Sequence, residues 1–223
     1  MDFLLEEPDD MSHTLTVLWT IEPQAAPRPW LACSRCRGAR PFECSGKTRL
    51  NANGRRLDAW LIYRCADCDD TWNRPIFERQ YVRDIAPDTL DALQNSDPGW
   101  IRRVSFDVEG LRRSTDKIEE FADCHVTRRV VAQPRDACTH LEIVLEVPLA
   151  VSMRADRLLS AELGLSRNRL VRLEEAGRLT LLSGSRKALQ RPIRNGLRVA
   201  LDLSDEGDRG EIADRAGGIL QPA

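Results

Sequence analysis

Two Cys-x-x-Cys pairs constrain this chain more than any other feature. The pairs are Cys33-Ser-Arg-Cys36 and Cys65-Ala-Asp-Cys68, and 28 residues separate them. A two-residue gap lets both thiolates of a pair face one ion, and four thiolates complete the tetrahedral coordination that structural zinc prefers. The pattern therefore predicts one structural zinc ion held by Cys33, Cys36, Cys65 and Cys68, with no open coordination position for a substrate.

A redox-active pair and an iron–sulfur centre are the alternatives to zinc. A thioredoxin-like redox site needs only one Cys-x-x-Cys pair, and iron–sulfur centres use other ligand spacings. The three remaining cysteines leave a second metal site open, through Cys124-His125 and Cys138-Thr-His140. Cysteines such as Cys44, Cys124 and Cys138 are more often small buried hydrophobic residues. Histidines such as His125 and His140 are more often ordinary surface residues.

The cysteine count and the N-terminus indicate the compartment. Seven cysteines do not suit a fully paired disulfide framework in a secreted chain. The first ten residues, MDFLLEEPDD, lack the basic region of a secretory signal. No window offers about 18 uninterrupted apolar residues. We therefore expect a cytoplasmic protein that does not enter the membrane.

The region around the cysteines has the pattern of short strands. Residues 14–22, TLTVLWTIE, predict a strand that Pro23 ends. Residues 48–50 and 57–64 form two further strand-like runs, joined by the turn sequence Asn51-Ala-Asn-Gly54. A hairpin between two cysteine pairs is how a zinc ribbon is built. We therefore assign residues 1–74 to a zinc-ribbon domain.

The hairpin is also basic, with Lys47, Arg49, Arg55, Arg56 and Arg64, and it is interleaved with aromatic residues. Such a mixture can bind single-stranded nucleic acid. The favoured interpretation is that the aromatic residues form the core of the ribbon, since this segment has few other large apolar side chains. These residues are Trp60, Tyr63 and Trp72.

Residues 75–149 predict a middle segment of helices and strands. Ile76, Phe77, Tyr81 and Ile85 have helix-like spacing. Two further helices are expected from Pro87 and over residues 98–112, followed by strands at 126–132 and 141–147. The tail after Leu203, residues 204–223, is rich in Gly and Asp and is expected to be disordered.

Charge sets residues 150–203 apart from the rest of the chain. The whole chain has a net charge of −2, but this segment has 11 Arg and Lys against 5 Asp and Glu. A basic module between acidic parts suggests a polyanionic partner for that module. The alternative interpretation is a solvated, arginine-rich surface.

This basic segment resembles the S-four RNA-binding domain. Arg154, Asp156 and Leu159 match the opening of its pattern, and Ser166-Arg167 matches the start of its second helix. Further matches are Gly177-Arg-Leu-Thr-Leu and Ile193-Arg-Asn-Gly196. The residue types predict two short helices here: Gly164 ends the first, and Ser166 caps the second. The resemblance implies that the basic face of these helices binds structured RNA. The residues expected on this surface are Arg154, Ser166, Arg167, Arg169, Arg172 and Lys187.

A winged helix-turn-helix is the competing resemblance. The run LSAELGLSRNRLVRLEEAGRL is similar to the DNA-reading helices of a bacterial repressor. The Arg154-x-Asp156 start and the RPIRNG loop have no role in a winged helix. The RNA interpretation is therefore favoured over the DNA interpretation.

Most of the chain is similar to an uncharacterised bacterial family, domain-of-unknown-function family 1062. The similarity lies in TVLWTIEP, the two cysteine pairs, SGKTRLNANGRRLDAWLIYRC and CDDTWNRPI. It supports a zinc ribbon and a bacterial cytosolic origin. The family implies no activity, so the functional hypothesis rests on the residues.

Together these patterns predict an α+β protein: a zinc ribbon, a mixed helical and β-strand middle, and an S-four-like module at 150–203. The expected function is non-enzymatic binding of structured RNA, such as ribosomal or transfer RNA. A DNA-binding regulator is the first alternative, and an enzyme with unidentified catalytic residues is the second. Only three histidines, at positions 13, 125 and 140, are available as general bases.

Overall fold

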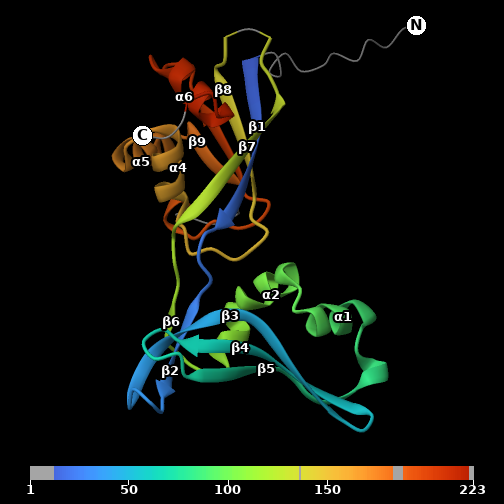
Figure 1. The fold of residues 1–223 in the computed structure, drawn as a ribbon. Coiled ribbons are helices and arrows are strands. Elements are labelled where there is room, and N and C mark those ends of the chain that lie inside the picture. Colours follow the sequence, from blue (N-terminus) through green and yellow to red (C-terminus); the bar gives the residue numbers. More distant parts are fainter. Residues whose placement is uncertain (1–12, 136, 183–187, 221–223) are drawn as a thin grey trace, which may run out of the picture. The chain divides into compact units, whose positions relative to one another are not determined.

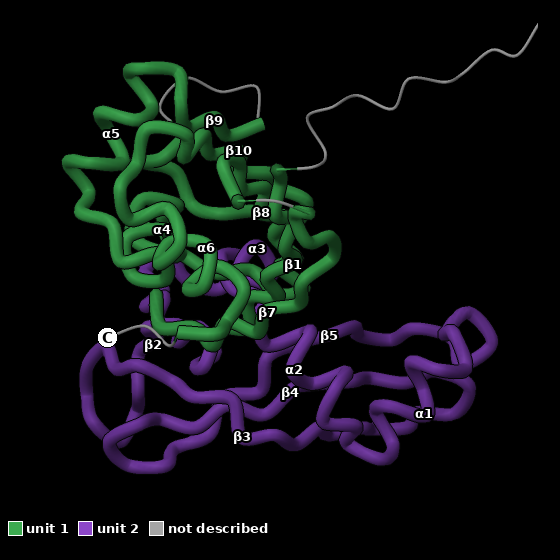
Figure 2. The backbone as a smooth tube through the Cα atoms, turned by 90° about the horizontal axis from the view of Figure 1, so that it is seen from above, with its two compact units in different colours: residues 1–23, 122–223 green, residues 24–121 purple. Residues whose placement is uncertain are grey.

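The computed structural model describes residues 13–135, 137–182 and 188–220. The chain forms two compact units, which Figure 2 distinguishes by colour. Unit 2 is Gln24–Phe121, and unit 1 combines the chain before Gln24 with the chain after Phe121. Unit 2 is therefore an insertion in unit 1. The boundaries differ from the predicted segments 1–74, 75–149 and 150–203, because the first strand pairs with strands more than 100 residues later.

Unit 1 contains a five-stranded mixed sheet in the order β7-β1-β8-β10-β9. Strand β1 is antiparallel to β7 and parallel to β8, and β10 is antiparallel to both β8 and β9. The strands expected at 14–22, 126–132 and 141–147 are confirmed. The bounds are β1 (Thr14–Pro23), β7 (Cys124–Ala132), β8 (His140–Glu146), β9 (Leu179–Leu182) and β10 (Arg198–Asp202).

One face of this sheet forms the core of unit 1. Side chains alternate along a strand, so β1 buries Leu15, Val17, Trp19 and Ile21 while the residues between them stay partly exposed. The helices α4 (Ala155–Leu163), α5 (Arg167–Glu175) and α6 (Arg209–Gly217) lie beside the sheet in Figure 1. Their apolar residues join the same core cluster as the buried face. A short 3₁₀ helix, η3 (Ala188–Gln190), precedes β10.

The junction between α4 and α5 forms as the residue types predict. Helix α4 ends at Gly164, whose φ of 71° is the left-handed conformation that glycine adopts without steric cost. The Ser166 hydroxyl oxygen then accepts a hydrogen bond from the backbone N–H of Arg169 and caps α5.

The segment after Leu203 differs from the expectation of disorder, because it contains helix α6. Ile212 and Ala216 are buried and lie four positions apart, on one face of the helix. The abundant Gly and Asp residues conceal this short apolar stripe in the sequence. The stripe acquires its stabilising partners from the core of unit 1, where α6 packs against helix α4 and strands β1 and β7.

Unit 2 contains a five-stranded antiparallel sheet in the order β5-β4-β3-β2-β6. A two-residue turn, Gly54-Arg55, joins β3 to β4, and Gly54 has a φ of 60°. The predicted hairpin is thus present, with longer strands than expected. The bounds are β2 (Arg28–Cys33), β3 (Gly38–Asn53), β4 (Arg56–Cys65), β5 (Thr71–Tyr81) and β6 (Ile118–Glu119).

Residues 75–85 form no long helix, which corrects the sequence prediction. They continue β5 and then enter a single 3₁₀ turn, η2 (Val82–Asp84). The pairing of β5 with β4 shifts register on both sides of Ala59. These irregularities break the two-residue alternation of a regular strand. The apolar residues therefore have a spacing that imitates a helix.

Helices α1 (Pro87–Asn95), α2 (Pro98–Ser105) and α3 (Val108–Arg112) follow in unit 2. The helix predicted over 98–112 is two helices. Asp107 separates them, and its carboxylate accepts a hydrogen bond from the backbone N–H of Gly110 to cap α3. The Thr48 hydroxyl of β3 donates to the Leu93 carbonyl oxygen at 2.6 Å, which attaches α1 to the sheet.

The mixed α+β fold class is confirmed by these two sheets and six α-helices among the described residues. In the part of the chain that the structure describes, no helix is long and apolar enough to cross a membrane.

Candidate metal centre and basic surface

The four predicted cysteine ligands meet at one point in unit 2. The Cys33 and Cys68 sulfurs lie 3.5 Å apart, and the Cys36 and Cys65 sulfurs lie 3.9 Å apart. All four sulfurs lie within 4.8 Å of one another. One metal ion can therefore be bound by all four side chains at once.

The ends of the strands position these sulfurs. Cys33 ends β2 and Cys65 ends β4, so each pair lies at a turn between adjacent antiparallel strands. The residue after each pair, Arg37 or Asp69, has a left-handed φ of 55° or 61° respectively. Each turn thus has a residue in the left-handed conformation directly after its second cysteine.

Polar contacts join the two turns. The Ser34 hydroxyl donates to the Asp70 carboxylate at 2.7 Å, and Arg35 donates to the Cys68 carbonyl oxygen at 2.9 Å. The Ser34 hydrogen bond is the main cause that holds the pKa of Asp70 below its usual range. The turns are therefore fixed to each other by more than the sulfur atoms.

The thiols also affect one another. Contact with the neighbouring thiols, first of all Cys68, raises the pKa of Cys36 to about 12. Several adjacent sulfurs do not readily carry negative charge together unless a cation compensates them. This electrostatic cost is what a bound metal cation would remove.

The aromatic residues of the hairpin divide between the two faces of the sheet. Tyr63 is buried, and its ring lies 5.3 Å from that of Trp72 at a tilt of 58°. Both belong to the cluster that packs against Cys33 and Cys65. Trp60 lies on the opposite face, because it is three positions from Tyr63 in the same strand.

The other cysteines do not join this centre. Cys44 lies in β3, while Cys124 and Cys138 pack against the core of unit 1. The Cys138 thiol lies 3.3 Å from the His140 carbonyl oxygen. Across residues 13–135, 137–182 and 188–220, the four-cysteine group alone brings three or more Cys, His, Asp or Glu side chains close enough to bind a metal.

The predicted nucleic-acid-binding residues do not all share one surface. Arg154 is exposed and pairs with Asp156 through two hydrogen bonds, of 3.0 and 2.6 Å. Arg167 is exposed at the start of α5, and Ser166 is the cap described above. Lys187 lies outside the described residues. Arg167 lies about 200° around the helix from Arg169, so these two face different directions.

Arg169, predicted to contact nucleic acid, has a structural role within unit 1. Its guanidinium forms hydrogen bonds of 2.7 and 2.6 Å with Asp208 and also contacts Glu206. These hydrogen bonds, with Asp208 first, raise the pKa of Arg169. Arg169 therefore joins α5 to the segment before α6, and its charge is compensated within the protein.

Arg172 lies near Arg169 and is exposed. It lines a cavity of about 300 Å³ with Arg169, Arg178 and Glu206. Arg178 also pairs with Glu206, at 3.0 Å. Of the basic groups lining this cavity, Arg172 alone has no ion pair with a described residue.

Two further exposed arginines lie beside Arg154, in the loop before β10. Arg154 forms an isolated β-bridge with Pro192, between Arg191 and Arg194. The Ala155 N–H also donates to the Arg191 carbonyl oxygen at 3.0 Å. The RPIRNG sequence contains the signal for this placement, but Arg191 and Arg194 are not among the predicted binding residues.

The fold and the cysteine group define an α+β protein of two units, one of which brings four cysteine sulfurs close enough together to hold one metal ion. Comparison with family models then identifies the family. The model described as "Protein of unknown function (DUF1062)" matches residues 50–185, which is more than half of the chain. The chain belongs to this family. Searches of curated proteins and of solved structures find no match.

Proposed function

We propose that this chain is a non-enzymatic, cytoplasmic, zinc-containing protein that binds structured RNA through an S-four-like module at residues 150–203. The observation that carries the proposal is a group of three exposed arginines, Arg154, Arg191 and Arg194, held by backbone contacts at the start of α4. We call these three residues the arginine cluster.

Backbone hydrogen bonds fix the loop of the arginine cluster on both sides. The Ile193 N–H donates to the Met153 carbonyl oxygen at 2.9 Å, and the Gly196 N–H donates to the Leu145 carbonyl oxygen at 2.8 Å. The Asn195 side chain accepts from the Val147 N–H at 2.9 Å. A preorganised loop loses less conformational entropy when it contacts phosphates. This supports a binding role for the loop.

The charges of the cluster favour a polyanion. Arg191 and Arg194 have no acidic partner among the described residues, and Asp156 compensates only Arg154. Arg167 and Arg172 on α5 are likewise exposed without a described acidic partner. Phosphate groups supply the missing negative charge and accept the forked donors of arginine.

The sulfur geometry supports zinc as the metal. Four thiolates at about 2.3 Å from a tetrahedral zinc ion would lie about 3.8 Å from one another. The 3.5 and 3.9 Å separations agree with this value. An all-thiolate site leaves no position for a substrate, so the ion would stabilise unit 2 rather than catalyse a reaction.

A competition titration at fixed, near-physiological salt tests RNA binding. The full chain is titrated with a hairpin RNA against the DNA duplex of matching sequence. We expect the RNA to bind more tightly, since a surface that recognises A-form shape and 2′-hydroxyls discriminates against B-form DNA. Affinity should also fall log-linearly with salt.

Matched charge reversals locate the surface. Arg194→Glu and Arg167→Glu should each weaken RNA binding by roughly tenfold. Arg198→Glu is the control, because Arg198 lies in β10 between buried neighbours and points away from the face that the helices cover. Equal weak binding to both nucleic acids, unchanged by Arg194→Glu, would contradict the proposal.

DNA binding is the second candidate. The order of α4, a short turn, α5 and the antiparallel pair β9–β10 also fits a winged helix-turn-helix. Tighter binding of the DNA duplex in the same titration would favour this function.

A further inference from the structure

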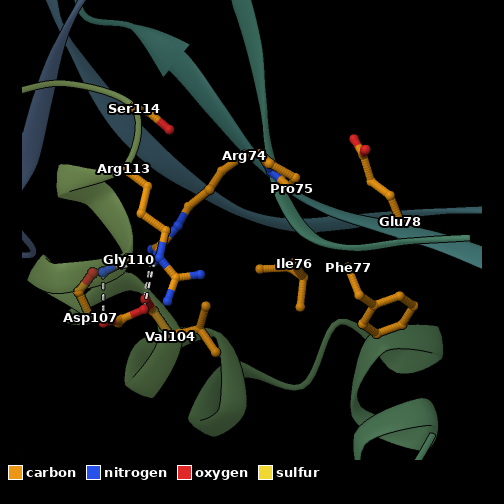
Figure 3. Close-up of a pocket in the computed structure, with 10 residues that line it drawn as sticks. All are labelled: Arg74, Pro75, Ile76, Phe77, Glu78, Val104, Asp107, Gly110, Arg113 and Ser114. Atoms are coloured by element: carbon orange, nitrogen blue, oxygen red, sulfur yellow. Dashed lines mark hydrogen bonds and ion pairs between the residues drawn. The ribbon is translucent and has the colours of Figure 1, made fainter. Parts of the chain in front are cut away.

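Unit 2 has a cavity of about 490 Å³ that the metal centre and the arginine cluster do not use. Figure 3 shows it between strand β5 and helices α2 and α3. This volume lies in the range of small-molecule pockets, which combine apolar walls with a few polar groups. Its apolar wall contains Pro75, Ile76, Phe77 and Val104.

A rigid buried arginine forms one end of the cavity. Only 4% of the Arg74 side chain is exposed, and its guanidinium donates to the Val104 carbonyl oxygen at 2.8 Å and to the Asp107 carboxylate at 2.9 Å. A Cβ at Gly110 would overlap both Asp107 and Arg74. The glycine therefore permits this close packing, and the end of the cavity is held in one shape.

The same end carries an uncompensated positive charge. Asp107 neutralises Arg74, but Arg113 lines the cavity without an acidic partner among the described residues. Figure 3 shows the Arg113 side chain reaching toward Arg74 and Asp107, while Glu78 lies at the far end with its carboxylate directed away. The cavity thus has a cationic end, with Ser114 nearby, and an apolar wall beside it.

We propose that this cavity binds a small monocarboxylate with an apolar body. The carboxylate accepts hydrogen bonds from the Arg113 guanidinium, and the apolar body packs against Ile76, Phe77 and Val104. A forked guanidinium matches a carboxylate better than it matches a neutral amide. The apolar wall distinguishes such a ligand from small inorganic anions.

Benzoate and its neutral analogue benzamide test the proposal on the full metal-loaded chain. Amide chemical shifts of Gly110 and Ser114 are followed during each titration. We expect saturable shifts with benzoate in the millimolar range or below, and binding of benzamide weaker by roughly tenfold. Equal affinity for the two probes, or no saturation by benzoate up to about 10 mM, would overturn the proposal.

Two neighbouring arginines provide the matched variants. Arg113→Gln should weaken benzoate binding roughly tenfold, because Arg113 is the one cation of the cavity wall without an acidic partner among the described residues. Arg112→Gln should leave binding unchanged, since Arg112 pairs with Glu109 and Glu120 and does not line the cavity. The same loss in both variants would show attraction to general surface charge and contradict a built site.

Discussion

The indole N–H of Trp19 donates a 2.9 Å hydrogen bond to the backbone carbonyl oxygen of Ala216, a residue 197 positions later in the chain. Both residues are fully buried. This bond attaches α6 to strand β1, and Ile212 packs into the same core. Helix α6 is therefore part of the hydrophobic core of unit 1.

Ile212→Ala should lower the free energy of unfolding of unit 1 by about 2–4 kcal/mol, because it leaves a cavity under α6. The effect should appear as faster hydrogen exchange of the amides in β1 and β7. Ile219→Ala is the control, since that side chain is 76% exposed and its removal should change stability by less than about 0.5 kcal/mol. Equal exchange in the two variants would show that α6 does not stabilise the sheet.

Cys65→Ser should reduce zinc content well below one ion per chain and lower the melting temperature of unit 2. Three thiolates bind the ion less tightly than four, and binding energy contributes to folding. Elemental analysis and thermal unfolding measure the two effects. Cys44→Ser should leave zinc content unchanged, because Cys44 lies outside the four-cysteine group. Stoichiometric iron in place of zinc would contradict the metal assignment.

Gly110→Ala should lower the free energy of unfolding of unit 2 by about 2–4 kcal/mol, because the new methyl group would displace Asp107 from buried Arg74. Gly99→Ala, in α2, should be neutral or slightly stabilising. Its Cβ would meet no atom closer than 3.4 Å, and alanine favours a helix. Urea unfolding curves of the two variants measure these changes. An unchanged free energy of unfolding for Gly110→Ala would contradict the close packing of Gly110 against Asp107 and Arg74.

The ion pair between Arg169 on α5 and Asp208 should make part of the free energy of unfolding of unit 1 depend on pH. The Arg169 guanidinium lowers the pKa of Asp208. A carboxyl whose pKa is lower in the folded state stabilises the fold above its unfolded pKa of about 3.9 and loses this contribution as pH falls further. Asp208→Asn should therefore cost a few tenths to about 1 kcal/mol at pH 7 and less at pH 3. Urea unfolding at both pH values measures this loss of unfolding free energy. The same loss at pH 7 and at pH 3 would show that the ionisation of Asp208 does not stabilise the fold.

Arg37→Gly should raise the free energy of unfolding of unit 2 by about 0.5–1 kcal/mol. A non-glycine side chain pays a steric cost in the left-handed conformation that Arg37 adopts. Ala66→Gly, in the second cysteine turn, should instead destabilise, because Ala66 has no positive φ and glycine gains entropy in the unfolded chain. Urea unfolding of the metal-loaded protein compares them. Destabilisation by both substitutions would show no strain at Arg37.

The features predictable from the sequence are those encoded by neighbouring residues. The spacing within each Cys-x-x-Cys pair is local, and only a few chemistries use it. The ends of α4 and α5 follow from Gly164 and Ser166, whose preferences also act locally. The α+β class then follows from strands and helices with clear periodicity.

The features that were missed depend on distant partners. The β5 strand is specified by its pairing with β4, and the bulges near Ala59 remove its alternating pattern. Arg169 resembles any exposed helical arginine until Glu206 and Asp208 approach it from 37 and 39 residues later in the chain. Sequence spacing contains no signal for such an ion pair.

The insertion of unit 2 between β1 and β7 also determines an order of events on the ribosome. Synthesis delivers β1 first, yet both of its neighbours, β7 and β8, follow the complete chain of unit 2. Unit 2 is continuous in sequence, so all its strands are available while β1 still lacks partners. Vectorial synthesis therefore leaves the apolar strand TLTVLWTIEP unpaired for at least 100 further residues, or about 5–20 seconds. Over that interval β1 exposes apolar side chains and unpaired backbone groups, a combination that makes a nascent strand prone to aggregate.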